Sequence, residues 1–336
     1  MTAGHARVVD VAVHLPGTGM TTAEVEARLA ELNEGLVPPP GMIERFTGVG
    51  YRHIAPDGWM ASDLAVAAAR ELLASCGRDV SEIDLIIFAA TSADTVEPAT
   101  AHIVAAKLGA RCPVFDLKNA CNSVLNAIEV ANALIRGGHY GRVLIACGER
   151  LTIATRWRLD SVDELVTAGA SHTLSDAGAA LLLEASDTPG VLAHRSVAES
   201  AAWSTTAMPV VVGGDGADLR VGAFEIKTFE LLAALDRADL VPLIDAVADL
   251  GLTMADFPVV CVHQAALPYL WTFCERAGIR RESTVVTIAE HGNVASASLP
   301  LQLTLAARAG RLRRGDPVAL IGLGSGLSLG IVVLRW

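Results

Sequence analysis

Cys121 stands where a strand-like run meets a helix-forming run, a position that suits a nucleophile. The run 112–117 is apolar and strand-like, and the pattern that follows predicts a buried helix that begins at Cys121, Asn122 and Ser123 and ends at Gly137-Gly138. Free backbone N–H groups and the helix dipole favour an anion at a helix start, so we expect the pKa of the Cys121 thiol to be lowered. The alternative is a small apolar core cysteine.

A histidine and an asparagine occupy matching places in the second half of the chain. Thirty positions separate Thr91 from Cys121, and thirty separate His263 from Asn293. Each pair spans a strand end, a helix, a second strand and a turn, which indicates an internal duplication. If the halves pack about a pseudo-twofold axis, equivalent loops converge and Cys121, His263 and Asn293 should meet. Taken alone, His263 could be a core histidine and Asn293 a helix N-cap.

The elements that must position these residues alternate between buried strands and helices, which is typical of layered α/β proteins. Apolar strand runs are expected at 6–15, 84–91, 142–147, 179–184 and 317–322, and helices at 22–32, 61–75, 100–108 and 296–308. We predict an N-terminal half, 1–185, that carries Cys121, and a C-terminal half, 186–336, that carries His263 and Asn293. Residues 186–235 fit neither half, and we interpret them as a cap or entrance segment.

Composition excludes several classes of function. The formal charge of −11 disfavours nucleic acids and anionic membranes as partners. No apolar run approaches the roughly 18 residues of a membrane span, and the first residues lack the apolar stretch of a signal peptide, so we expect a cytoplasmic protein. The six cysteines lack metal-ligand spacing and are expected as reduced thiols, with no metal or other cofactor.

Four segments together resemble the thiolase-fold condensing enzymes, and most closely the β-ketoacyl-acyl carrier protein synthase III family: Cys121, Val262-His263-Gln264-Ala265, residues 291–298 (HGNVASAS) and Gly322-Leu-Gly-Ser-Gly326. The resemblance covers nearly the whole chain. It implies two duplicated α/β halves packed as α-β-α-β-α layers, a homodimer, and substrates that are acyl thioesters on coenzyme A or acyl carrier protein.

The resemblance also implies a role for each residue. Cys121 would take an acyl group from a thioester, because sulfur is both a good nucleophile and a good leaving group. His263 and Asn293 would donate hydrogen bonds to the enolate oxygen of the second substrate. Backbone N–H groups of four residues would form the other oxyanion hole: Cys121, Gly324, Ser325 and Gly326.

Some positions depart from the family pattern. Met42 and Phe46 align where synthase III proteins usually carry a tryptophan and an arginine that grip the nucleotide of coenzyme A. The run Arg220–Glu225 stands where a pantetheine-contacting asparagine motif is expected. Standard acetyl-CoA priming is therefore in doubt, and carrier-bound or unusual acyl donors are favoured. We have no account from the sequence of the polar residues Asn119 and Asn122 around the cysteine.

The run from Thr95 to Thr100, TVEPAT, resembles a segment of the olefin-pathway enzymes that join two acyl chains. In those enzymes a glutamate contributed across the dimer serves as base for a non-decarboxylative Claisen condensation. If Glu97 corresponds, its carboxylate could deprotonate the α-carbon of a second acyl chain. The alternative is a surface acid before a proline.

The leading hypothesis is a ketosynthase III-like acyltransferase that forms an acyl-Cys121 intermediate and a C–C bond between acyl thioesters, in polyketide, fatty acid or other specialised metabolism. A second hypothesis transfers the acyl group to a hydroxyl or amine. Family members with that activity often carry an acid in place of the asparagine, so Asn293 argues against it. A third is a non-catalytic partner subunit, although such partners commonly lose the cysteine or the histidine.

Overall fold

The apolar runs of the N-terminal half form a five-stranded mixed sheet. In the computed structural model, which describes residues 4–36, 39–214 and 218–336, its strand order is β1-β7-β6-β4-β5. Strand β4 pairs in parallel with β5 and β6, whereas β7 runs antiparallel to β6 and β1. The bounds are β1 (His5–His14), β4 (Leu85–Ala89), β5 (Val114–Leu117), β6 (Arg142–Glu149) and β7 (Ala177–Ser186).

The second sheet repeats this order with one strand reduced. Its order is β13-β14-β15-β8, with β13 parallel to β14 and β15 antiparallel to β14 and β8. The counterpart of β5 is a single parallel bridge between Val260 and Thr284. The predicted duplication is therefore visible in the strand pairing. The bounds are β8 (Val191–Ala198), β13 (Val259–Val262), β14 (Pro317–Gly324) and β15 (Ser328–Arg335).

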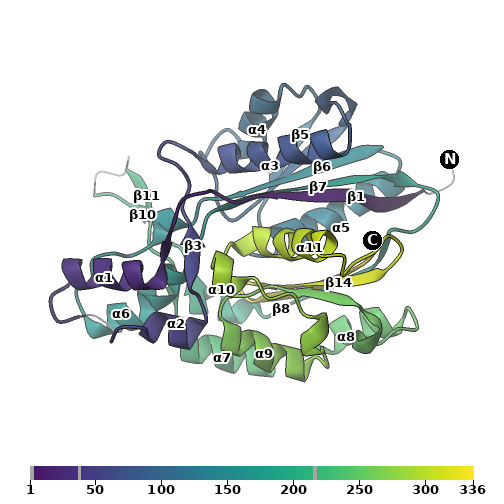
Figure 1. Cartoon of the computed structure of the whole chain (residues 1–336). Helices are drawn as coiled ribbons and strands as arrows, with labels where there is room; N and C mark the ends of the chain where they lie inside the picture. The colour runs from purple at the N-terminus through teal and green to yellow at the C-terminus, as the bar shows by residue number, and fades with distance from the viewer. Residues whose placement is uncertain (1–3, 37–38, 215–217) are drawn as a thin grey trace.

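The predicted α-β-α-β-α layering is confirmed (Figure 1). Helices α3 (Ala61–Ser75) and α4 (Thr100–Leu108) cover the outer face of the first sheet, and α8 (Val241–Ala248) and α9 (Leu267–Arg276) cover that of the second. Helices α5 (Ser123–Arg136) and α11 (Ser298–Arg308) lie between the sheets. Because both central helices are buried, the segments at their starts lie inside the protein.

Shorter elements complete the chain. The helices are α1 (Thr22–Leu32), α2 (Met42–Thr47), α6 (Val162–Ala168), α7 (Thr228–Arg237) and α10 (Ile288–His291). Two-stranded pairs join β2 (Gly19–Thr21) to β3 (Tyr51–His53), β9 (Thr206–Ala207) to β12 (Glu225–Ile226) and β10 (Val210–Val212) to β11 (Leu219–Val221). Among the helices of the described ranges, none has the length and apolar character needed to cross a bilayer.

The interpretation of residues 186–235 as a cap needs correction at its start. Strand β8 belongs to this segment, yet it pairs with β15 along the edge of the second sheet. Its sequence, VLAHRSVA, mixes polar and apolar residues, as suits an edge strand in which each residue is partly buried or exposed. Residues 187–190 connect β7 to β8, and the part of the segment after β8 lies outside the sheet.

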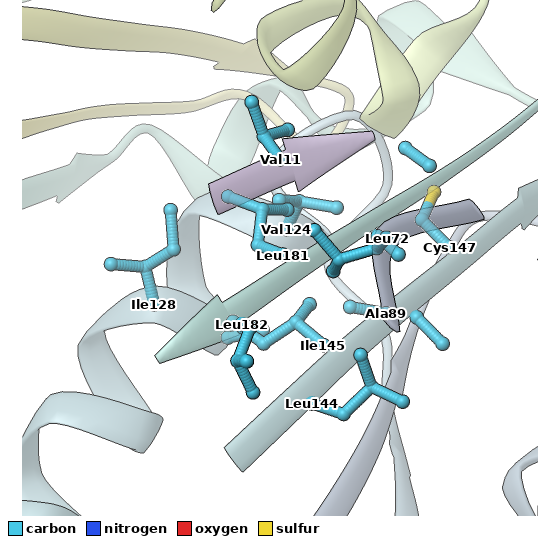
Figure 2. Packing of buried hydrophobic residues seen from close by; sticks show 14 of the residues in the cluster. Val11, Leu72, Ala89, Val124, Ile128, Leu144, Ile145, Cys147, Leu181 and Leu182 are labelled. Atoms are coloured by element: carbon cyan, nitrogen blue, oxygen red, sulfur yellow. The ribbon is translucent and has the colours of Figure 1, made fainter. Parts of the chain in front are cut away.

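Close packing of helices on the first sheet depends on small residues. Val124 and Ile128 of α5 are fully buried and belong to the same apolar cluster as Leu181 and Leu182 of β7 (Figure 2). On the other face, a Cβ added to Gly148 would lie 1.8 Å from the backbone oxygen of Ala61 in α3. Glycine is required there because the helix backbone touches the sheet. This contact places the end of β6 against the start of α3.

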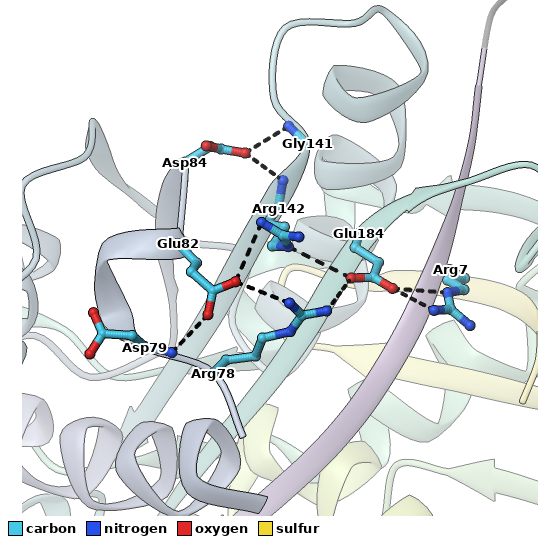
Figure 3. Close-up of polar contacts among 8 residues, drawn as sticks. All are labelled: Arg7, Arg78, Asp79, Glu82, Asp84, Gly141, Arg142 and Glu184. Atoms are coloured by element: carbon cyan, nitrogen blue, oxygen red, sulfur yellow. Dashed lines mark hydrogen bonds and ion pairs between the residues drawn. The ribbon is translucent and has the colours of Figure 1, made fainter. Parts of the chain in front are cut away.

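A network of ion pairs joins the strands of the first sheet at the end where β6 begins (Figure 3). Glu184 on β7 accepts a hydrogen bond of 3.1 Å from Arg7 on β1 and is paired with Arg78 and with Arg142 on β6. Arg78 also pairs with Glu82 at 3.0 Å. Because Arg142 begins β6 and Glu149 ends it, the network fixes strand register at the end far from Glu149.

Candidate active site

Cys121 lies on a tight turn between β5 and α5. Helix α5 begins at Ser123, so the predicted helix start at Cys121 is wrong by two residues. Ala120 has a φ of +47°, a left-handed conformation that is uncommon for residues other than glycine. The turn is held because Ser123 Oγ donates to the Ala120 carbonyl at 2.7 Å and the Asn122 N–H donates to the Asn119 carbonyl at 2.9 Å. Such strained backbone often marks a functional residue.

The expected lowering of the thiol pKa is also wrong. Burial, together with the nearby Glu149 carboxylate, raises the pKa of Cys121 to about 12. The helix dipole does not compensate, because the thiol precedes the first turn of α5 rather than sitting in it. Cys121 is therefore a neutral thiol at rest, and acyl transfer must include loss of its proton.

Asn122 joins the Cys121 turn to the glycine-rich hairpin between β14 and β15. Its side-chain Nδ2 donates to the carbonyl and to Oγ of Ser328, at 3.0 and 2.9 Å. Glycine is needed opposite, because a Cβ at Gly322 would lie 2.1 Å from Asn122 Oδ1. At the tip, Gly326 has a φ of +104°, and a Cβ there would meet nothing within 4 Å. Three of the predicted oxyanion-hole residues, Gly324, Ser325 and Gly326, thus lie on a hairpin fastened to the residue after Cys121.

His263 follows the last residue of β13 and is buried, with 4% of its surface exposed. Its backbone N–H donates to the Ile321 carbonyl on β14 at 2.9 Å, and Gln302 of α11 forms two hydrogen bonds with the backbone of Val262. Burial lowers the pKa of His263 to about 4, so the ring is neutral at pH 7. Its Nδ1 has no hydrogen-bond partner among the residues that the structure describes. A neutral ring can donate one hydrogen bond without carrying charge.

Gln264 ties the His263 loop to the segment that leads to Asn293. Its Oε1 accepts from the N–H groups of Thr287 and Ile288 at 2.9 and 3.1 Å, and its Nε2 donates to the Val285 carbonyl at 2.6 Å. These contacts fix the N-terminal end of α10 directly beside the end of β13.

Asn293 is held by backbone on both sides and keeps its amide nitrogen free. Its N–H donates to the Thr173 carbonyl at 2.9 Å, and its carbonyl accepts from the Ser175 N–H at 3.0 Å. Its side-chain Oδ1 accepts from the Ala295 N–H at 3.0 Å, which identifies the oxygen because a backbone N–H can only donate. Nδ2 forms no hydrogen bond within the described ranges, and this leaves the donor that an enolate oxygen would need.

A buried carboxylate that the sequence analysis missed connects the loops that carry the candidate residues. Glu149 ends β6, is fully buried, and accepts hydrogen bonds from the N–H groups of Thr91 and Ser296 at 2.8 and 3.2 Å. Ser296 in turn donates its hydroxyl to the Ala120 carbonyl at 2.7 Å. Burial raises the pKa of Glu149. An acid directly after an apolar strand is the signal that could have identified it.

Cys121 faces an apolar wall. It packs against a cluster whose buried members are Leu151, Ala154, Leu174 and Ala295 and whose partly buried members include Met208 and Phe224. Met208 and Phe224 come from the part of the chain after β8 that was interpreted as a cap or entrance segment. Residues from both halves of the chain therefore form an apolar cluster against which the thiol packs, which suits an acyl chain.

Glu97 is not brought to the other candidate residues within one chain. It lies exposed on the loop between β4 and α4, next to Val96, which is 90% exposed. Its carboxylate forms no hydrogen bond or ion pair with any residue in the described part of the chain. Met42 and Phe46 lie on α2, and the Phe46 ring is largely exposed.

Comparisons with known proteins agree with this geometry. The family model of 3-oxoacyl-[acyl-carrier-protein] synthase III matches residues 115–200, and the model of the C-terminal part of that family matches residues 247–336. The β-ketoacyl-[acyl-carrier-protein] synthase III of Thiobacillus denitrificans is 32% identical, with 99% of both chains covered. That of Neisseria meningitidis is 28% identical over the same shares.

Solved structures show the same fold. Xanthomonas campestris OleA with bound cerulenin superposes with a TM-score of 0.89 at 25% identity and covers 100% of this chain and 98% of that one. FabH of Pseudomonas aeruginosa superposes with a TM-score of 0.85 at 26% identity over 99% of this chain and 98% of that one. Fold and sequence thus define a thiolase-fold acyl-transferring condensing enzyme. The chain belongs to the 3-oxoacyl-[acyl-carrier-protein] synthase III family.

Proposed function

We propose that this enzyme joins two acyl thioesters by Claisen condensation through an acyl-Cys121 intermediate. The observation that carries the proposal is the network of hydrogen bonds that ties the Cys121 turn to the segments of His263, Asn293 and the glycine-rich hairpin. Hydrogen bonds thereby link four parts of the chain that lie far apart in sequence, and one of these parts carries a thiol that packs against an apolar cluster.

In the first half-reaction the sulfur of Cys121 attacks the carbonyl of the donor thioester. The S–H bond of Cys121 breaks, the acyl group moves to Cys121, and the proton leaves with the carrier thiol. Negative charge develops on the carbonyl oxygen, and backbone N–H groups of Cys121 and of residues 324–326 are proposed to stabilise it. The neutral thiol of the resting enzyme makes this stabilisation important, because no preformed thiolate drives the attack.

In the second half-reaction an enolate of the second thioester attacks the acyl-Cys121 carbonyl, forms the C–C bond and releases Cys121. The enolate arises by loss of carbon dioxide or by removal of an α-proton. The free Nδ2 of Asn293 and the neutral ring of His263 are the proposed donors to its oxygen. An acceptor hydroxyl or amine would need a base at this place rather than a second donor, so Asn293 disfavours acyl transfer to oxygen or nitrogen.

We infer that the substrates are acyl groups carried by coenzyme A or acyl carrier protein, in specialised metabolism. The apolar wall supports a hydrocarbon acyl group. A variant of Xanthomonas campestris OleA, which shares the fold at 24% identity, was solved with bound lauric acid and lauroyl-CoA. Met42 and Phe46 offer neither the indole nor the guanidinium that the family uses to grip the nucleotide, which supports a donor other than acetyl-CoA.

Glu97 acts, in this proposal, on the site of a partner copy in a homodimer, because within its own chain it lies exposed and away from Cys121. Mixing two inactive variants tests this arrangement. A heterodimer of Cys121→Ala and Glu97→Ala chains contains one site with an intact cysteine and an intact glutamate from the other chain. Each heterodimer should therefore have up to half the activity of a wild-type dimer, and an equal, randomly paired mixture up to about a quarter. If Glu97 served its own chain, the mixture would stay inactive.

The proposed function is tested by separating the half-reactions. Acyl-enzyme formation, followed by intact-protein mass, should vanish in Cys121→Ser and persist in Asn293→Ala, whereas condensation should fail in both. Cys76→Ser is the matched control, because Cys76 is a partly buried cysteine at the end of α3 and should change neither step. Turnover by Cys121→Ser at the wild-type rate would refute the proposal.

A further inference from the structure

His53 and His291 form a histidine pair next to the segment of Asn293, and the proposed chemistry does not use this pair. His53 ends β3, and His291 ends α10 two residues before Asn293. Their rings approach with His53 Nε2 at 3.0 Å from His291 Nδ1, and the ring planes are 16° apart. Both rings are partly buried, and they come from segments 238 residues apart.

The hydrogen bonds determine which nitrogen carries each proton. His53 Nδ1 lies 2.8 Å from the Pro16 carbonyl, which can only accept, so Nδ1 carries the proton. In a neutral ring this leaves Nε2 as an acceptor, and His291 Nδ1 must then donate to it. Burial lowers the pKa of both rings, which favours these neutral forms at pH 7. The pair is therefore a directed chain from His291 through His53 to Pro16.

The same strand fastens Asn293 through its backbone. The His53 N–H donates to Ser175 Oγ at 2.8 Å, and the Ser175 N–H donates to the Asn293 carbonyl at 3.0 Å. The Gly50 N–H donates to the Ala289 carbonyl of α10 at 2.8 Å. Between the histidine and the asparagine, Gly292 has a φ of +66°, and a Cβ there would lie 2.9 Å from the Thr173 carbonyl. This segment has little room to shift unless its contacts break.

We propose that His53 is a positioning residue that, through His291, holds the Asn293 amide in the orientation needed to stabilise the enolate. The inference rests on the proposed role of Asn293 in condensation. Gln264 fixes the start of α10 and His53 fixes its end, so the two contacts together set where the chain enters Asn293. Loss of the His53–His291 contact should misalign the Asn293 amide, whereas Cys121, which lies on a different turn, should stay in place.

Charged groups near the pair set its response to pH. Asp176, at the start of the turn into β7, faces His53, and Glu290 lies beside His291; both favour protonation, whereas burial and the second ring oppose it. Protonation of both rings would place two N–H donors opposite each other and break the pair. Condensation should therefore fall at acidic pH before acylation does.

Two variants at position 53 and one control variant test the proposal. His53→Phe keeps a ring but removes both hydrogen bonds, and should lower kcat of condensation roughly tenfold, the scale for a misplaced hydrogen-bond donor, with acyl-Cys121 formation within about twofold of wild type. His53→Gln can still accept from His291 and should retain most of the rate. His14→Phe is the control, because His14 is a partly buried histidine on β1 whose ring stacks on Trp59.

The pair itself is tested by combining His53→Phe with His291→Phe. The double variant should condense no more slowly than the slower single variant. The decrease of its condensation rate with falling pH should differ from that of wild type. Equal losses in acylation and condensation, equal losses in His53→Phe and His53→Gln, or strictly multiplicative losses would each overturn the proposal. Failure of the proposed function would show differently, as condensation that survives in Cys121→Ser or Asn293→Ala.

Discussion

Replacing Gly322 by alanine should disturb the active site through Asn122, and a second substitution should relieve the disturbance. The new Cβ would lie 2.1 Å from Asn122 Oδ1 and 2.9 Å from its Cγ, closer than real contacts allow. The amide must therefore move, which breaks its two hydrogen bonds to Ser328. Overpacking costs about 1–3 kcal/mol and each lost hydrogen bond about 0.5–1.5 kcal/mol. We expect Gly322→Ala to lower the free energy of unfolding by about 2–6 kcal/mol.

Asn122→Ala removes the amide that the new methyl group would strike. Alone it should cost about 1–3 kcal/mol from the two lost hydrogen bonds, and the double variant should cost little more. The cycle should therefore show a coupling of at least about 1 kcal/mol. Urea unfolding of the four proteins measures it, with Gly17→Ala as the control because a Cβ there meets nothing within 4 Å. Costs that add within about 0.5 kcal/mol would refute the contact.

Three further predictions concern other groups. Glu149→Gln removes the charge that raises the pKa of Cys121, so alkylation of Cys121 by iodoacetamide at pH 8 should accelerate; slower alkylation would contradict this. His263 binds a proton in the unfolded chain below pH 6.5 but in the folded chain only near pH 4. The free energy of unfolding should therefore fall by on the order of 3 kcal/mol as the pH is lowered from 6.5 to 4. His263→Gln should remove this pH dependence, as measured by urea unfolding. Gly148→Ala should lower Tm by many degrees, because its Cβ would strike the Ala61 backbone; an unchanged Tm would contradict the packing of α3 on β6.

The sequence predicts the layers and the order of the catalytic segments because these depend on local patterns. Strands such as the one expected at 142–147 contain continuous apolar runs, here 143–147, and the matched spacing from Thr91 to Cys121 and from His263 to Asn293 indicates the duplication. Both layers and order follow without knowledge of any tertiary contact.

The features that sequence analysis missed depend on partners far along the chain. The Cys121 pKa is raised rather than lowered because the fold buries the thiol and, in addition, brings Glu149 of another strand close to it. The role of Asn122 could not be predicted from the sequence because its hydrogen-bond partner, Ser328, lies 206 residues away. The same applies to His53, and β8 was misplaced because an edge strand exposed to solvent lacks a continuous apolar run.

The most direct test of the account is intact-protein mass spectrometry of wild type and Cys121→Ser after incubation with acyl-CoA and acyl-carrier donors, followed by malonyl, acyl and alcohol acceptors. We expect an acyl adduct that depends on Cys121 and is discharged by a second thioester with formation of a C–C bond. Release of carbon dioxide on discharge by malonyl thioester would identify the decarboxylative route, and discharge by an acyl thioester without it would identify the Glu97 route. An adduct that forms equally in Cys121→Ser, or one discharged only by alcohols, would contradict the account.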